Sequence, residues 1–420
     1  MLEWEIRDGV IQVSFSFAFS PFCLCYSSCP SNFFASAPSQ PSHVSTLPSA
    51  ANVLHVSIES FEDGSFSQAP QQLLFTTTAD RRLHILYPDS NFSLERCIGH
   101  LQDSPILSCV PLGKTYLTTI SCGMSGQVVL YDHKEDKVLE ERRDHKKYVV
   151  KVAVWENEWV ATAGWDAKVF LYKISSENAL LLGSPVAVVH FPTNPETITF
   201  IKPPDLDQTI LLVTRRDSTS LYYYSLPTTD ELSMPTSEPA ELELLGLQNL
   251  APHSNAWIAF SPSSVAVCPT DPTLLAVATS AVPHMKLILV RLLVPSSAAV
   301  VDPTTQVAQT RANLAIQDKE DTAIQVHVST LAPQTPYSTP QVVWRPDGSG
   351  VWVNGDDGVL RGLEAKTGKI VATLKNGHEP GSKIRSIWCG TVNVGEGTQE
   401  WVVSGGFDRR LVVWKPDERK

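Results

Sequence analysis

The chain has 420 residues, of which 43% are hydrophobic and 18% are charged, and this balance excludes an intrinsically disordered chain. The formal net charge is −11, and the one charge-dense stretch, residues 133–151, mixes both signs, so neither nucleic acid nor a membrane surface is expected as a partner. No apolar run reaches the length of about 18 residues that a spanning helix needs, and the acidic start MLEWEIRDGV is unlike a secretory signal.

Residues 1–42 are expected to form an irregular N-terminal segment. The stretch VSFSFAFSPFCLCYSSCPSNFF, from Val13, is dominated by amino acids whose codons are rich in pyrimidines. One hypothesis is that residues 11–35 are a translated intron, left by a faulty gene model. The alternative is an exposed apolar tail, with a hairpin about Asp8 and Gly9.

The eight cysteines are too few for a disulfide scaffold in a chain of this length. Cys23, Cys25 and Cys29 are clustered, but no histidine lies at zinc-ligand spacing, so no metal site is expected. The other five fall in or near predicted strands and are expected to be reduced core thiols: Cys97, Cys109, Cys122, Cys268 and Cys389.

A repeat runs through the rest of the chain. A turn residue is followed by apolar or aromatic residues three and six positions later, and it is preceded by a β-rich run such as WVATAGW or WVVSGGF. The turn residues are Asp80, Ser125, Asp166, Asp217, Asp357 and Asp408, of which Asp217 keeps Tyr223 but has Ser220 three positions later. Residues 258–293 hold a weaker unit. A period of roughly 40 to 50 residues, with several short strands in each unit, is typical of a β-propeller.

Further residues resemble WD repeats. His100, His145 and His378 precede their units as the Gly-His dipeptide does, and Tyr131-Asp132 and the terminal VVW at 412–414 stand where the Trp-Asp dipeptide belongs. The resemblance covers roughly residues 50 to 415 and is weakest in the fourth and fifth units, which lack both dipeptides. It implies an all-β fold, a seven-bladed β-propeller of four-stranded antiparallel blades.

The propeller is expected to span residues 43–416. Its blades are expected at 54–97, 104–142, 149–183, 196–250, 256–330, 341–375 and 384–415. Residues 293–322 are rich in Pro, Ser and Thr at their start, which predicts a loop insertion, with a fourth strand for blade five at 324–331. The chain ends after three strands of blade seven. Residues 43–47 are therefore expected to pair antiparallel with 410–414 and close the ring.

Ser404, His378 and Asp408 together suggest a catalytic triad. The resemblance to WD repeats implies instead a buried structural tetrad of His378, Asp408, Ser404 and Trp414. Blade three repeats it with His145, Asp166, Thr162 and Tyr172, and a catalytic triad is not expected to recur in two blades. No phosphate-binding loop is present, and no catalytic residue, cofactor or metal is expected.

The residue before each turn aspartate is expected to project onto the face around the central channel. Trp165, Phe407 and Arg216 hold this position, with Tyr148 and Lys383 entering the first strands nearby. Trp, Tyr and Arg are frequent interface anchors, so these five are the candidate partner-binding residues.

The expected function is a scaffold or adaptor that binds a protein or peptide partner on the channel rim. A propeller-fold hydrolase and a nucleic-acid-associated propeller are the alternatives; the first needs several acidic or histidine tip residues and the second a basic ring. Free thiols and the absence of a signal indicate a cytoplasmic or nuclear location.

Overall fold

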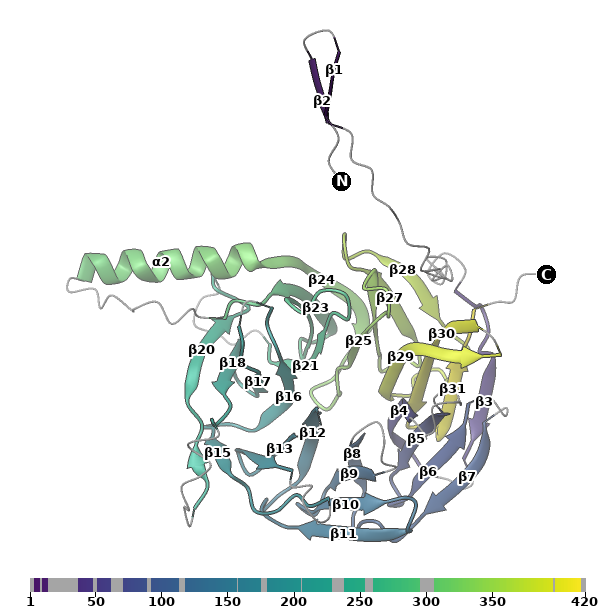
Figure 1. Cartoon of the computed structure of the whole chain (residues 1–420). Coiled ribbons are helices and arrows are strands. Elements are labelled where there is room, and N and C mark those ends of the chain that lie inside the picture. The colour runs from purple at the N-terminus through teal and green to yellow at the C-terminus, as the bar shows by residue number, and fades with distance from the viewer. Residues whose placement is uncertain are drawn as a thin grey trace.

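The computed structural model describes residues 4–7, 10–13, 37–47, 51–61, 71–88, 92–112, 118–156, 158–174, 180–204, 206–228, 238–253, 260–294, 306–395 and 397–416. Seven four-stranded antiparallel sheets stand as blades around one axis (Figure 1). The prediction of an all-β, seven-bladed propeller is confirmed.

The first four blades follow one another along the chain. Blade one consists of β4 (Val53–Phe61), β5 (Gln71–Thr78), β6 (Leu83–Tyr87) and β7 (Ser93–Ile98). Blade two consists of β8 (Ile106–Pro111), β9 (Thr118–Gly123), β10 (Val128–Asp132) and β11 (Lys137–Arg142). Blade three consists of β12 (Val149–Trp155), β13 (Trp159–Gly164), β14 (Lys168–Lys173) and β15 (Ala187–His190), to which β19 (Ala240–Glu241) adds in parallel. Blade four consists of β16 (Pro195–Ile201), β17 (Ile210–Arg215), β18 (Ser220–Ser225) and β20 (Leu244–Asn249).

The last three blades complete the ring. Blade five consists of β21 (Pro262–Val267), β22 (Leu274–Thr279), β23 (His284–Arg291) and β24 (Ile324–Pro333), the last of which covers the strand predicted at 324–331. Blade six consists of β25 (Val342–Trp344), β26 (Gly350–Val353), β27 (Leu360–Glu364) and β28 (Ile370–Leu374). Blade seven consists of β29 (Ile384–Val394), β30 (Gly397–Gly406), β31 (Arg410–Trp414) and β3 (His43–Thr46).

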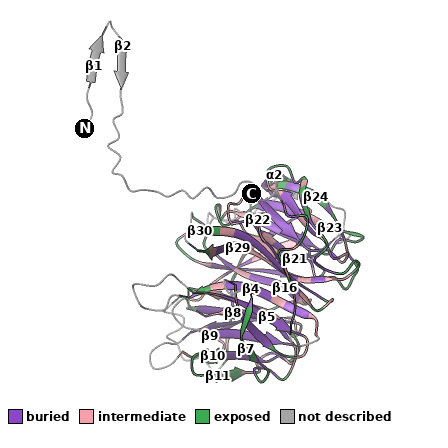
Figure 2. Ribbon diagram, turned by 90° about the vertical axis from the view of Figure 1, so that its right-hand side faces the viewer, coloured by how far each residue is buried: buried purple, intermediate pink, exposed green. Residues whose placement is uncertain are grey.

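The core fills the spaces between neighbouring blades. The second strands β9 and β13 are buried along their whole length, because each faces a neighbouring blade on both sides. Figure 2 shows that buried residues occupy much of the blades. One apolar cluster joins Val56 and Leu74 of blade one to Trp401 and Val413 of blade seven. The core therefore continues across the junction between the two ends of the propeller.

The strand β3 closes the ring, as predicted. It pairs antiparallel with β31 in a register that sets His43 opposite Val413 and Thr46 opposite Arg410. Leu47, just beyond it, is buried in the cluster between blades seven and one. The pairing gives β31 a neighbour on its outer edge, which would otherwise expose unpaired backbone groups.

The insertion predicted as a loop at 293–322 contains a helix, α2 (Gln306–Ala323). Its sequence holds Ala, Gln, Leu, Lys and Glu and lacks Pro and Gly, so helical propensity is high. Its apolar residues do not gather on one face, and the periodic signal of a packed helix is therefore missing. The helix is tied to blade four where Glu320 Oε1 accepts a hydrogen bond from the Asn249 amide at 2.7 Å.

Part of the segment predicted to be irregular is ordered as strands. β1 (Trp4–Arg7) and β2 (Val10–Val13) pair as an antiparallel hairpin, which agrees with the hairpin alternative. Residues 14–36, and with them Cys23, Cys25, Cys29 and most of the stretch assigned to a translated intron, lie outside the described residues.

Candidate functional site

A β-bulge at the start of the first strand shapes the channel wall in six of the seven blades. In each, one extra residue interrupts the register with the second strand and turns toward the axis. The extra residues are Leu54, Leu107, Val150, Glu196, Ser263 and Arg385. All six line one cavity of about 340 Å³, which is the central channel.

The residue after the bulge also lines the channel. In blades two, five and seven it is a serine, and its hydroxyl oxygen accepts a backbone hydrogen bond from the first strand of the next blade. These bonds run from Val152 N to Ser108 Oγ at 3.4 Å, from Val342 N to Ser264 Oγ at 3.4 Å and from Val56 N to Ser386 Oγ at 3.1 Å. In blades one and three the same position holds His55 and Lys151.

The channel wall carries charges that the sequence interpretation did not single out. Burial and the nearby Lys151 charge lower the pKa of His55 to about 3, and burial lowers the pKa of Lys151. Burial lowers the pKa of Arg385 to about 10, and the carboxylate of Glu196 opposes this shift. The positions of these four residues in the sequence did not indicate a cluster, because only the bulges bring their side chains together.

The predicted tip residues Trp165, Arg216 and Phe407 meet at this cavity, as expected from blade geometry. Each is held by a backbone hydrogen bond to the residue that enters its own first strand, for example Trp165 N to Tyr148 O at 2.8 Å and Phe407 N to Lys383 O at 2.9 Å. Met124 occupies the equivalent position in blade two and also lines the cavity. It was missed because its turn residue is a serine and not an aspartate.

Trp165 is the centre of a stacked group. The ring of Tyr148 lies 5.5 Å away at an interplanar angle of 25°, and the Arg216 guanidinium lies 5.4 Å from the centroid of the indole. Arg216 Nε also donates to Glu196 Oε1 at 2.6 Å. Trp165 is therefore held in one orientation, with Tyr148 exposed beside it.

Lys383 and Tyr148, the two candidates that enter first strands, lie beside the cavity and are not part of its lining. The Lys383 Nζ lies 3.1 Å from Asp356 Oδ2 and donates to Thr335 Oγ1 at 2.9 Å. Asp356 is a turn residue, so the ion pair is formed between neighbouring blades. The Lys383 ammonium therefore fixes the loop that joins β24 to β25.

That loop brings Tyr337 to the channel, a residue the sequence interpretation missed. Pro336, Tyr337, Ser338 and Thr339 line the cavity, and the side chain of Tyr337 is 89% exposed. The loop lies outside the repeat pattern, and the remaining signal is a tyrosine in a short Thr-Pro-rich segment, TPYSTP.

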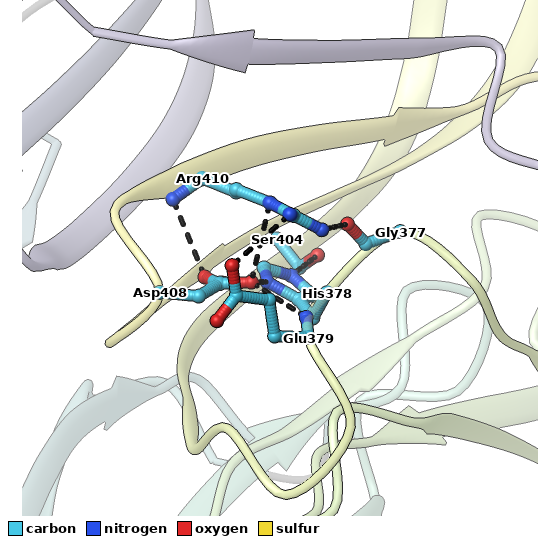
Figure 3. Close-up of polar contacts among 6 residues, drawn as sticks. All are labelled: Gly377, His378, Glu379, Ser404, Asp408 and Arg410. Carbon is cyan, nitrogen blue, oxygen red and sulfur yellow. Dashed lines mark hydrogen bonds and ion pairs between the residues drawn. The ribbon is translucent and has the colours of Figure 1, made fainter.

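Blade seven contains the predicted chain of buried polar groups (Figure 3). His378 Nδ1 donates to Asp408 at 3.0 Å, and the Ser404 hydroxyl lies 2.8 Å from Nε2, which accepts its proton in the neutral ring. Burial raises the pKa of Asp408, but hydrogen bonds from His378 and from backbone amides outweigh it and hold the pKa below its usual value. Trp414 packs against His378, yet its indole Nε1 has no hydrogen-bond partner among the described residues, so the tetrad is a triad with an apolar neighbour.

Blade three repeats the triad. His145 Nδ1 lies 2.9 Å from Asp166 Oδ1, and Nε2 lies 2.9 Å from Thr162 Oγ1. The hydroxyl of Tyr172, the expected fourth member, donates to Asp144 at 3.1 Å. The Tyr172 hydroxyl also interacts with the Thr162 hydroxyl, so Tyr172 joins the triad of blade three as expected and adds a bond to the residue before His145.

Blade two uses a glutamine in the place expected for His100. His100 is exposed, whereas Gln102 is buried and donates from Nε2 to Ser121 Oγ at 3.0 Å. The Gly-His pattern therefore predicted the correct segment before blade two, but the buried polar residue there is Gln102 and not His100.

Other sequence expectations concern metals, thiols and membranes. Among the described residues, no three His, Cys, Asp or Glu side chains gather as a metal site would require. Cys109, Cys122 and Cys268 are buried as expected, and Cys389 is half-buried, whereas Cys97 is exposed. No helix in the described part of the chain has the length and apolar character needed to cross a bilayer.

Seven blades around a lined channel define the chain as a seven-bladed β-propeller. Residues 63–415 match the family described as "UCP007778, beta-propeller domain", and the chain belongs to that family. No curated protein matches the sequence.

Proposed function

We propose that the protein is a WD-repeat scaffold or adaptor that binds a protein or peptide partner at the channel rim. The observation that carries this proposal is the group of aromatic side chains around one cavity: Trp165, Phe407 and Tyr337. Phe407 is 42% exposed, and Tyr337 is exposed almost completely. An exposed aromatic ring adds little to folding, whereas Trp and Tyr are prominent among the anchors of protein interfaces.

The two buried triads support the WD-repeat part of the proposal. Each joins a histidine before the blade to the turn aspartate and to a hydroxyl on the second strand. Such a chain satisfies polar groups inside a blade and fixes the turn that carries Trp165 or Phe407. The triads thus hold two of the proposed anchors in place.

A structural role for Ser404 is favoured over catalysis. The Ser404 side chain is fully buried, and it lines neither the central channel nor the second cavity, beside His378. A nucleophile has to meet its substrate, and this hydroxyl faces packed protein. We therefore keep the hydrolase as the disfavoured alternative.

A nucleic-acid partner is also disfavoured. The cations of the channel lie within a cavity of about 340 Å³, and the chain as a whole has a net charge of −11. Binding a nucleic-acid backbone requires an extended basic surface. With its free thiols, the protein is proposed to act in the cytoplasm or nucleus.

The test begins with a pull-down to isolate a partner, followed by calorimetry with Trp165→Ala and Phe407→Ala. A desolvated aromatic anchor contributes about 2–4 kcal/mol, so each variant should bind roughly 30- to 1000-fold more weakly. Folding should be unchanged, because these tips contribute little to the core.

The matched control is Leu247→Ala, which truncates an equally exposed apolar side chain on the outer strand β20. It should bind like the parent protein. If Trp165→Ala and Phe407→Ala both remain folded and bind normally, the channel rim is not the binding face.

A further inference from the structure

The charges on the channel wall are unbalanced. Lys151, Arg385 and Arg216 line the cavity together with a single carboxylate, Glu196, among the described residues. The Glu196 carboxylate is already paired with Arg216, through the hydrogen bond at 2.6 Å, and so does not balance Lys151 or Arg385. In a chain with a net charge of −11, this cavity is a local concentration of positive charge.

Lys151, Arg385 and His55 come from neighbouring positions on the channel wall, and their charges interact. Lys151 and His55 hold the same position, directly after the bulges of blades three and one. Arg385 is the bulge residue of blade seven, and its neighbour Ser386 accepts the hydrogen bond from Val56 N at 3.1 Å. That bond ties the residue after Arg385 to the residue after His55, so these two side chains start from adjacent points on the wall.

Lys151, Arg385 and one ring nitrogen of His55 lack partners within the described part of the chain. Neither Lys151 nor Arg385 forms a hydrogen bond or a close ion pair there, and the nearest compensation for Arg385 is the distant charge of Glu196. The Nε2 atom of His55 is buried and also has no hydrogen-bond partner. Lys151 and Arg385 are half-buried. A partly desolvated cation without a counter-ion carries an energetic cost, which a bound anion would reduce.

Hydroxyl donors complete the surroundings. The oxygens of Ser108 and Ser386 each accept a backbone hydrogen bond, so their protons are available to an acceptor in the channel. Ammonium, guanidinium and hydroxyl groups in one cavity match an oxyanion, which accepts hydrogen bonds through several oxygens.

We propose that the channel between Lys151 and Arg385 binds an oxyanion, a phosphate or carboxylate group, that the partner inserts past Trp165 and Phe407. The proposal rests on the proposed function for the source of the group, but the site itself can be tested without a partner. The probe is inorganic phosphate, added to the full chain and followed by the line width of its ³¹P resonance.

The parent protein should broaden the phosphate signal in a saturable way. Lys151→Gln and Arg385→Gln should each weaken binding at least tenfold, because each removes a direct charge–charge contact. The control is Lys366→Gln, at the exposed turn between β27 and β28, which should bind phosphate like the parent. No broadening, or equal broadening with all four proteins, overturns the site.

A second readout separates this role from a structural one. In phosphate-free buffer, Lys151→Met should melt at a higher temperature than the parent, because it removes a half-buried, unpaired charge and its repulsion from Arg385. Phosphate should raise the melting temperature of the parent but not of the variant. A lower melting temperature for the variant in both buffers contradicts the proposal.

The source of the oxyanion is tested with the isolated partner. If the partner carries the group, phosphate competes with it and Arg385→Gln weakens it at least tenfold. If phosphate binds the channel without competing with the partner, and Arg385→Gln has no effect on partner binding, the partner does not supply the oxyanion and the proposed source is wrong. A different result would refute the proposed function: normal partner binding to Trp165→Ala and Phe407→Ala would show that the channel rim is not the binding face.

Discussion

Arg345 and Glu400 form a bidentate ion pair between blades six and seven. Nε donates to Oε1 at 2.9 Å and Nη2 donates to Oε2 at 2.7 Å, and both side chains are almost completely buried. Arg345 directly follows β25, and Glu400 lies on β30. The pair therefore links two blades through charges that water does not reach.

Glu400→Gln is expected to lower the free energy of unfolding by roughly 3–5 kcal/mol, because it leaves the Arg345 guanidinium buried with only part of its compensation. Urea denaturation measures the effect. The control is Asp271→Asn, which breaks the exposed pair with Arg291 and should cost less than about 1 kcal/mol. Equal costs for the two variants would show that burial does not control the strength of the Arg345–Glu400 pair.

Asp408→Ala is expected to destabilise the protein by about 1–3 kcal/mol for each group left without a partner. His378 Nδ1 and the Glu379 amide, at 2.9 Å from Oδ2, both lose their acceptor. Asp132→Ala is a matched control and should cost less, since within the described residues that turn aspartate accepts only from the exposed amides of Lys134 and Glu135.

The same triad should be inert toward a serine-reactive phosphonate. Mass spectrometry of the treated parent protein should find Ser404 unmodified, because its hydroxyl is fully buried. Modification of Ser404 that disappears in His378→Ala would support the hydrolase instead.

The stability of the propeller should fall with acid through His133. Its burial and the Arg96 charge lower its pKa to about 4 from the usual 6.5, and Nε2 lies 3.0 Å from Thr119 Oγ1. The unfolded chain binds a proton below pH 6.5 whereas the native state does not, so stability is present above 6.5 and is lost progressively down to pH 4. The full loss is on the order of 2–4 kcal/mol.

Urea denaturation of the parent and of His133→Gln between pH 7.5 and 4.5 measures this difference, and the variant should show the shallower decline. Glu59 acts in the opposite sense, because burial raises its pKa to about 7 and its contribution is lost as pH rises from 4.5 to 7. Glu59→Gln should therefore steepen the decline. Parallel curves for the parent and His133→Gln would contradict the assignment.

The repeat pattern predicted the blades because its signals are local. A turn aspartate followed by Val169 and Tyr172, or by Leu411 and Trp414, fixes a hairpin within a dozen residues. The fourth strand of blade three lies at Ala187–His190, beyond the predicted end at 183, because a long connection precedes it. Closure by residues 43–46 was predictable, since β31 needed a partner and no later strand remained.

The channel wall was not predictable from the sequence. A bulge has no residue signature in this chain, as Leu54, Glu196 and Arg385 all occupy the same position. The charges it brings together are separated by whole blades in the sequence. The ion pair of Lys383 with Asp356 was unpredictable for the same reason, because it joins neighbouring blades.

Deletion of residues 1–40 is expected to leave the melting temperature nearly unchanged, whereas deletion of residues 1–50 should lower it by several degrees. The longer deletion removes all of β3 and Leu47, and exposes the edge of β31. Differential scanning calorimetry on the two truncated chains measures the effect. Equal melting temperatures would show that β3 contributes little to closure.

The closing strand also sets an order for events on the ribosome. Residues 43–46 are synthesised several hundred residues before their partner strand at 410–414. At 5–20 residues per second, the nascent chain spends on the order of 20 to 75 s with that strand unpaired. Ring closure therefore waits for the third strand of blade seven, and a ribosome that stalls before this strand leaves a propeller with two open edges.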